Sequence, residues 1–433
     1  MTGRARFIGP DRRQIGWEMV DLEAQLPSDH RARVVWAFVE RLDLSAFYDA
    51  IKSREGEAGR PAADPAVLLA LWLFATVEGI GSARALERLA ESDVAYRWVA
   101  GGVPVNYHGL ADFRVDHVQL LDELLTESVT ALIDEGLVSL SEIAVDGTKV
   151  RACASMSSFK TGTRLAQIEA EVAARLAALK AELESDPAAC SRRQWAARER
   201  AARDVEKRAR QARVALDRVR AERQERAKTH AKDEAKKSEP KASTSDVEAR
   251  CMRFADGAIR PAFNAQVAAA PEEGIIVSVE MTDRRNDSGL APPMVDDIVR
   301  RYGEAPQNLL VDTTYATVED IAALAAHAAG PVTVYAPVPK EREDVSPGTL
   351  RNRRSQRSRE PESVKQWRQR MDTDAAHKVY ARRKLIERLN AHCKNHGFGI
   401  LRVRGLVKAK AVALMHALGN NLMAAHRLRT ATA

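Results

Sequence analysis

The chain has 433 residues, of which 45% are hydrophobic, a content that is normal for folded globular domains. At roughly 150 residues per domain, this length predicts about three domains and excludes a disordered tail or a mini-protein. Lys and Arg outnumber Asp and Glu by 67 to 60, and this net charge of +7 is only a weak indication of an anionic partner.

The cysteines and the apolar runs indicate the compartment. The four cysteines lie far apart with no paired spacing, which favours neither a disulfide framework nor a zinc ribbon and fits a reducing cytoplasm. The longest apolar run, about residues 66–77, is too short to cross a bilayer, and the first residues lack the apolar core of a signal peptide. We therefore expect a soluble, unexported cytoplasmic protein without a membrane partner.

Charge alternates in sign along the chain. The net charge is −8 in residues 1–159, +8 in 160–245, −8 in 246–350 and +15 in 351–433. The densest basic stretch, 351–370, carries eight basic and two acidic residues and has almost nothing apolar to bury except Val364 and Trp367. This segment predicts a polyanionic partner, and a solvated flexible loop is the alternative.

The first 138 residues are predicted to form a helical N-terminal domain. Apolar residues recur at three- and four-residue spacing in four segments, 31–44, 65–77, 82–90 and 118–135. Asp64 followed by Pro65 is a favourable helix start. Short helices of this kind suit a helix-turn-helix module or any other small bundle, and the negative charge argues against a surface that faces nucleic acid throughout.

Residues 160–245 are predicted to be an insertion. Six apolar residues are spaced 3, 4, 4, 3 and 4 apart, as in a coiled-coil seam: Leu165, Ile168, Val172, Leu176, Leu179 and Leu183. Ser-Asp-Pro at 185–187 breaks this helix, and an arginine-rich helical stretch follows to about 228. We expect an antiparallel helical hairpin, followed by a mobile linker up to residue 245.

The pattern on both sides of the insertion predicts an α/β domain, built from residues 139–159 and 246–433. Short strands are predicted at 143–145, 263–270, 275–281, 308–311 and 332–338, with a tight turn at 271–274. Helices are predicted near 292–302, from Thr317 to about 329, and at 374–395. A basic loop is expected at 340–373.

Two aspartates and one helix carry the candidate chemistry. Asp146 and Asp312 each follow an apolar strand, where a carboxylate can face a crevice, although aspartates after strands often only start turns. In the last predicted helix, offsets of 0, 3, 7 and 14 place four residues on one face: Tyr380, Arg383, Glu387 and Lys394. An ordinary surface ion pair between Arg383 and Glu387 is the alternative for this face.

These residues resemble a known family. Tyr380, Arg383, Glu387 and Lys394 match the YREK signature of bacterial insertion-sequence DDE transposases, and the element order resembles the RNase H-like, retroviral-integrase-like catalytic core. Other stretches are similar to the same family, among them RPAADP, GSARALE, FADGAIRPAFNAQ, NDSGLAPPMVDDI and RGLVKAK. The resemblance implies that the N-terminal domain binds DNA ends, but VNYHGLADFR matches only in part, so no DNA-reading residue is carried over there.

The resemblance implies roles for individual residues. Asp146, Asp312 and Glu387 would be the catalytic residues and the ligands of two Mg²⁺ ions, with Mn²⁺ as an alternative metal. Such ions prefer oxygen ligands and stabilise the attacking and leaving oxygens of a phosphodiester. Tyr380, Arg383 and Lys394 would contact DNA.

Further residues are considered beside this set. The basic loop adds Arg353, Arg354, Arg357 and Trp367 as expected DNA contacts, and Trp367 would stack on an unpaired base unless it simply packs in the fold. Asp287 is either an acid behind the site or a turn residue. His392, Cys393 and His396 lie near Glu387, but no fourth metal ligand is evident.

The predicted function is that of a DNA transposase. It would bind terminal inverted repeats of double-stranded DNA, cleave the element ends and join them to target DNA, as a homodimer in the synaptic complex at the bacterial nucleoid. Two alternatives stay open: an RNase H-like DNA nuclease without strand transfer, and a catalytically inactive DNA-binding or scaffold protein.

Overall fold

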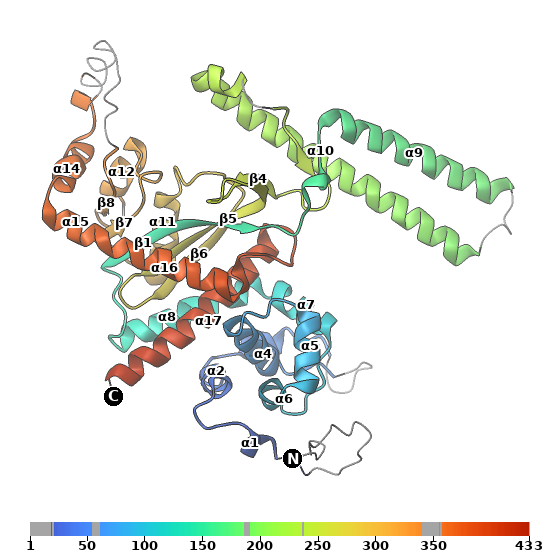
Figure 1. Cartoon of the computed structure of the whole chain (residues 1–433), viewed down its shortest axis with the longest axis horizontal. Helices are drawn as coiled ribbons and strands as arrows, with labels where there is room; N and C mark the ends of the chain where they lie inside the picture. The colour runs from blue at the N-terminus through green and yellow to red at the C-terminus, as the bar shows by residue number, and fades with distance from the viewer. Residues whose placement is uncertain are drawn as a thin grey trace, which may run out of the picture.

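The structure is a computed structural model that describes residues 19, 21–53, 61–185, 191–235, 238–339, 355 and 357–432 (Figure 1). A helical N-terminal part lies beside a domain built on a mixed sheet, and two long helices project from the far side of that sheet. Among the described residues, none of the helices has the length and apolar composition that a bilayer span needs.

The N-terminal part consists of short helices packed around one central helix. The central helix is α4 (Pro65–Val77), where Asp64 Oδ1 accepts from the Ala66 amide at 2.8 Å and nearly every residue is buried. The helices around it are α1 (Leu22–Gln25), α2 (Arg31–Val39), α3 (Ser45–Asp49), α5 (Ala83–Ser92), α6 (Val94–Ala100), α7 (Tyr107–Asp116) and α8 (Val118–Asp134). The predicted helices are confirmed, although the one expected over 31–44 ends at Val39, and the short α1, α3, α6 and α7 were not predicted.

The sheet has parallel and antiparallel halves. It is built from β1 (Glu142–Arg151), β4 (Arg250–Arg253), β5 (Ile259–Ala270), β6 (Ile275–Thr282), β7 (Asn308–Leu310) and β8 (Thr333–Tyr335). Strands β6, β5 and β1 pair antiparallel in that order, while β1, β7 and β8 pair parallel, and β4 pairs with the start of β5. The predicted turn between β5 and β6 is confirmed, and Gly274 takes the positive φ of 71° that this turn needs.

The first strand is longer than the sequence predicted. Its parallel pairing with β7 ends at Ala144, but its antiparallel pairing with β5 continues to Arg151. Asp146 therefore lies inside β1 and does not mark its end, which corrects the prediction. The pairing of β1 with β7 ends at Ala144, two residues before Asp146. On its β7 side, Asp146 therefore has no neighbouring strand among the described residues.

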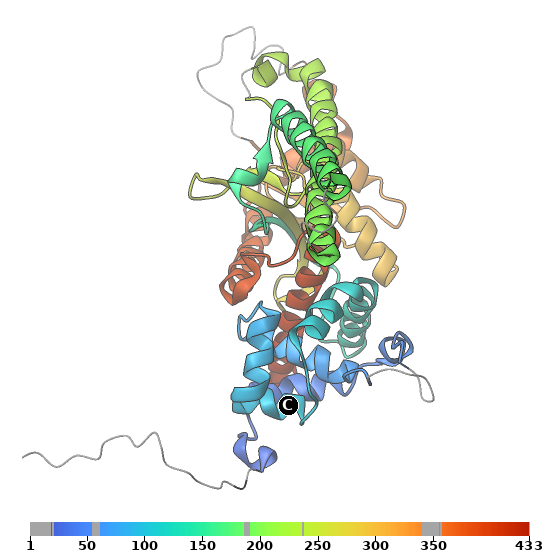
Figure 2. The same ribbon diagram turned by 90° about the vertical axis from the view of Figure 1, so that its right-hand side faces the viewer.

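The predicted insertion forms two antiparallel helices, α9 (Gly162–Ser185) and α10 (Arg192–Ala235), which project away from the sheet (Figures 1 and 2). Trp195 Nε1, near the start of α10, donates to the Leu179 carbonyl near the end of α9. The buried residues of α9 are every seventh one: Leu165, Val172 and Leu179. The short strands β2 (Phe159–Lys160) and β3 (Ala242–Ser243) pair at the base of the two helices.

The remaining helices cover the sheet: α11 (Ala291–Tyr302), α12 (Val318–Ala325), α14 (Glu362–Met371), α15 (Asp374–Tyr380), α16 (Lys384–Cys393) and α17 (Leu406–Thr432). Thr317 caps α12 as predicted, since its Oγ1 accepts from the Asp320 amide at 3.0 Å. The predicted basic loop 340–373 is wrong in its second half, because residues 362–371 form α14. Val364 and Trp367 anchor that helix in the core.

The long helix α17 joins the two parts of the molecule, and the sequence analysis did not predict it. It packs against β6 of the sheet and against α4 and α8 of the N-terminal part. Asn421 on α17 is buried and bonds both backbone groups of Ile276 in β6, at 2.8 and 2.7 Å. Apolar residues on several faces of one helix have no single-sided period, which is why the pattern was not recognised.

Candidate active site

The sheet register brings the two predicted aspartates together. Glu142 faces Asn308 and Ala144 faces Leu310 in the parallel pair of β1 and β7. Asp146 and Asp312 each come two residues after this last pair, Asp146 still within β1 and Asp312 just beyond the end of β7. Their carboxylates influence each other, because Asp312 contributes to a raised pKa of Asp146.

Asp146 is held by two side chains from the helical segment that crosses the sheet. Its Oδ1 accepts from Arg383 Nη2 at 2.6 Å, and its Oδ2 accepts from Asn390 Nδ2 at 2.8 Å. Burial raises the pKa of Asp146 above its usual value, and the negative charges of Asp312 and Glu387 raise it further, against the opposing effect of Arg383 and Asn390. The site therefore concentrates negative charge that calls for a cation.

Arg383 supplies the positive charge of this site. It lies in a 3-10 turn, η2 (Ala381–Arg383), between α15 and α16, and its side chain is only 9% exposed. Its Nη1 donates to Glu387 Oε1 at 2.5 Å, so one guanidinium joins Asp146 of the sheet to Glu387 of the helix. Arg383 and Glu387 do form the expected ion pair, with Glu387 56% exposed, but the guanidinium itself is buried and shared with Asp146.

The other residues of the predicted helix face lie near the same charges. Asp312 Oδ1 accepts from the amide and the hydroxyl of Thr314, and the amide contact measures 2.7 Å. Burial raises the pKa of Tyr380, and the charges of Asp312 and Glu387 add to this effect. Burial lowers the pKa of Lys394, which the nearby Asp146 partly offsets. The structure therefore brings the six acids and helix-face residues proposed from the sequence into one neighbourhood of charge.

The sequence pointed to Asp287 as a candidate acid behind the site but gave no sign of its partners Asn264, Gln266 and Tyr315. Asp287 Oδ1 accepts from Asn264 Nδ2 at 2.7 Å and from Gln266 Nε2 at 2.8 Å, and the Tyr315 hydroxyl donates to Gln266 Oε1. The Asp287 carboxylate also lies against Gly147, the residue after Asp146. The interpretation of Asp287 as an acid behind the site is favoured over that of a simple turn residue.

Gly147 tests this close approach. A Cβ at this position would lie 2.7 Å from Asp287 Cγ and 2.8 Å from Gln266 Nε2, which is too close for either group to stay in place. We expect Gly147→Ala to lower the free energy of unfolding by about 1–3 kcal/mol, measured by urea denaturation.

A matched control for this substitution is Gly109→Ala in α7, where the nearest neighbouring atom would be 3.7 Å away. This helix position should tolerate alanine or gain about 0.5–1 kcal/mol. Equal stability of Gly147→Ala and the wild type would contradict the close packing of Asp287 on β1.

The residues of the basic loop that were expected to contact DNA differ in their exposure. Arg353 and Arg354 lie outside the described residues. Arg357 is half-buried just before α14, where its carbonyl accepts from the Glu360 amide at 3.2 Å. Trp367 is 2% exposed and its Nε1 donates to the Ala336 carbonyl at 3.1 Å, so the packing alternative holds and base stacking is wrong for this residue.

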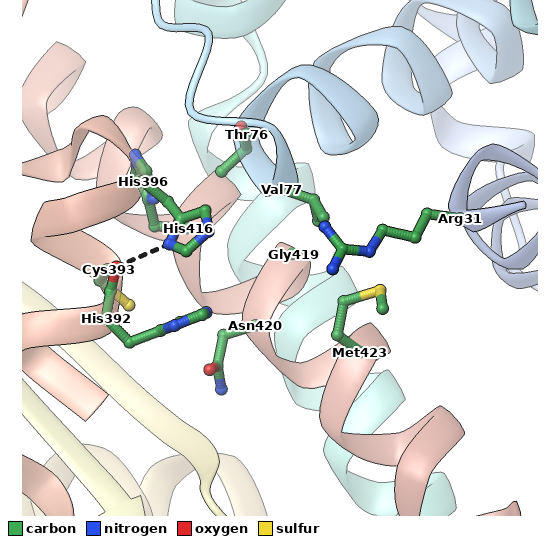
Figure 3. A pocket seen from close by; sticks show the side chains of 10 residues that line it. All are labelled: Arg31, Thr76, Val77, His392, Cys393, His396, His416, Gly419, Asn420 and Met423. Atoms are coloured by element: carbon green, nitrogen blue, oxygen red, sulfur yellow. Dashed lines mark hydrogen bonds between the residues drawn. The ribbon is translucent and has the colours of Figure 1, made fainter. Parts of the chain in front are cut away.

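The histidines near Glu387 line a separate pocket (Figure 3). His392 and His396 come from α16 and the π-helical turn η3 (Lys394–Phe398), and His416 comes from α17. Burial lowers the pKa of His416 to about 3, so it is neutral at physiological pH. His396 Nδ1 donates to the His392 carbonyl at 2.9 Å, which takes that nitrogen out of use as a metal ligand.

The carboxylate site fits a hard divalent cation in its chemistry. Asp146, Asp312 and Glu387 offer only oxygen donors, as Mg²⁺ and Mn²⁺ prefer. In the described part of the chain, however, no three His, Cys, Asp or Glu side chains are placed to hold an ion together. The guanidinium of Arg383 lies between Asp146 and Glu387, and it is the cation of the site in this conformation.

Comparisons with known proteins agree on one class. Residues 239–424 match the family model of a transposase DDE domain, and residues 20–116 match a second transposase domain (DUF772). No curated protein and no solved structure matches the chain. Both matches support a DNA transposase of the insertion-sequence type. The DDE match implies an RNase H-like fold with polynucleotidyl transfer activity, and the strand order β6-β5-β1-β7-β8 agrees with that fold.

Proposed function

We propose that this chain, which carries two transposase domains, binds the terminal inverted repeats of an insertion sequence, cleaves the DNA at those ends and joins them to target DNA. The observation that carries the proposal is the Arg383 guanidinium, which bridges Asp146 and Glu387 beside the point where β1 and β7 separate, while the charge of Asp312 acts on the same Asp146 carboxylate. These carboxylates come from distant parts of the sequence and have no shared structural role apart from this site.

The residues of the site divide into two groups by charge. Asp146, Asp312 and Glu387 would hold Mg²⁺ or Mn²⁺ through their carboxylate oxygens, once Arg383 turns away from them. A bound divalent cation would stabilise the charge that develops on the attacking and leaving oxygens. Arg383 and Lys394 would then bind phosphate oxygens of the DNA beside the cut, since both carry positive charge next to the carboxylates.

Other parts of the proposal rest on the family and the charge distribution. The matched N-terminal domain would bind the DNA ends, and two ends held in one synaptic complex imply a homodimer at the nucleoid. An RNase H-like nuclease without strand transfer uses the same site, so the products of the reaction decide between the two activities.

The experiment uses the full chain with a labelled duplex that carries the element end. We expect nicks at the end in Mg²⁺ or Mn²⁺ and none in EDTA, and joined products when target DNA is present. Nicking without joining would favour the nuclease, and DNA binding without nicking in either metal would favour the inactive scaffold.

A further inference from the structure

A groove separates the projecting helix α10 from the loop that follows β6. It encloses roughly 1520 Å³, part of it open to solvent, and is lined by the following charged residues: Glu222, Arg223, Glu225, Arg226, Arg250, Asp283, Arg284 and Arg285. All five basic residues are arginines. Arginine presents a planar fork of donors that matches phosphate oxygens, whereas lysine acts as a point charge.

The acids of the groove already have cationic partners. Arg250 is buried and contacts Asp283 at 2.9 Å and Glu222 at 3.1 Å, and Arg218 also pairs with Asp283. Glu225 pairs with Lys228 at 2.6 Å. The contacts of Arg218, Glu222, Arg250 and Asp283 hold α10 against the edge of the sheet. All three acids of the groove are thus paired with cations of the chain itself.

Three arginines of the groove are left without an acidic partner among the described residues. Arg223 donates to the Ser238 carbonyl and Arg284 to the Ser288 carbonyl, while Arg285 makes no ion pair there. Burial lowers the pKa of Arg285, and the positive charges of Arg250, Arg223 and Arg226 lower it further. Crowded guanidinium groups of this kind are stabilised by an anion that bridges them.

The groove adjoins the candidate active site through a short segment. Arg285 is two residues before Asp287, whose carboxylate lies against Gly147 beside Asp146. Side-chain directions at Asp146 and Gly147 alternate in β1, so residues 283–288 link the groove to the face of β1 opposite Asp146.

We propose that the groove between α10 and residues 283–288 binds the phosphodiester backbone of DNA, with Arg223, Arg284 and Arg285 as the phosphate contacts. This inference rests on the proposed function and gives the inserted helices a task in it. The insertion forms one wall of the DNA site and is not merely a spacer in the chain.

The test measures binding of the full chain to a random duplex of about 30 base pairs by fluorescence anisotropy, between about 50 and 200 mM salt. The slope of log K against log salt is negative, and each lost phosphate contact reduces its magnitude by about 0.9. Near 0.1 M salt, this corresponds to about eightfold weaker binding than that of the wild type. We expect the loss of one contact for Arg285→Gln. The double variant that carries Arg284→Gln and Arg285→Gln should lose two contacts, with twice the change in slope.

The matched control is Arg175→Gln, an exposed arginine of α9 that lies well away from the groove, roughly 25 Å along the helices. It should leave the slope unchanged, and circular dichroism should find the same fold in every variant. Equal slopes for wild type and Arg285→Gln, or equal losses for Arg175→Gln and Arg285→Gln, would overturn the proposal.

Two further arms separate the alternatives. If about 10 mM inorganic phosphate at matched ionic strength removes the difference between wild type and Arg285→Gln, the groove takes isolated anions and the backbone proposal fails. A chain that never nicks DNA but keeps the groove-dependent slope contradicts the proposed function alone. A chain that nicks DNA with an unchanged slope in Arg285→Gln contradicts the groove alone.

Discussion

Asp146→Asn should lower the rate of Mg²⁺-dependent nicking at the DNA end by at least about 10³-fold, or about 4 kcal/mol in activation free energy. Burial raises the pKa of Asp146, and the charges of both Asp312 and Glu387 add to this effect, so Asp146 interacts with both of the other carboxylates. An amide at this position keeps the size of the side chain but removes the negative charge that a divalent cation requires.

A second variant guards against a purely structural loss. Asp146→Asn leaves the buried Arg383 with one carboxylate fewer, whereas in Asp312→Asn the amide oxygen can still accept from Thr314. Both variants should lose nicking and keep DNA binding. The matched control is Asp256→Asn, an exposed aspartate paired with Arg260. Nicking by Asp146→Asn or Asp312→Asn within tenfold of the wild-type rate would remove the catalytic assignment.

The largest effect on stability is expected at Arg301 of α11. Its side chain is 0% exposed and contacts Asp297 and Asp122 at 2.6 Å each, and it also donates to Thr126. Asp122 and Thr126 belong to α8, so this pair joins the N-terminal part to the sheet domain. We expect Arg301→Gln to lower the free energy of unfolding by about 3 kcal/mol, because Asp297 and Asp122 lose the buried guanidinium that joins them and keep only the partly exposed Arg300 and Lys410.

The neighbouring Arg300 gives the matched control for this substitution. Arg300 also pairs with Asp297, but its side chain is 59% exposed. Arg300→Gln should therefore cost no more than about 1 kcal/mol in urea denaturation. Similar losses for the two variants would mean that the burial of Arg301 does not determine its contribution to stability.

Local signals account for the features that the sequence predicted correctly. Asp64 before Pro65, the hydroxyl of Thr317 and the turn at Gly274 act on their own neighbours in the chain, and the structure has each of them. The offsets of Arg383 and Glu387 also describe a local helix face. The sequence could thus predict one edge of the site, together with the strands that carry both aspartates.

The parts that the sequence could not predict depend on distant contacts. Asp287 became part of the site through Asn264 and Gln266 of another strand, and a single sequence contains no signal for that pairing. Trp367 lies in a basic segment whose composition suggests solvent, yet its hydrogen bond to the Ala336 carbonyl and its packing in the core decide its place. Asn390 could have been found, since it lies three residues after Glu387 and four before Lys394 on the same helix face.

The pairing of β2 with β3 has a consequence for how the molecule folds. Strands β1 and β5 must meet although Arg151 and its partner Ala262 are separated by the whole insertion. Helices α9 and α10 can form from contacts within the insertion, and the β2–β3 pair then holds Lys160 beside Ala242. Strand β1 can therefore pair with β5 across a short effective loop. The long insertion adds little to the entropic cost of assembling the sheet.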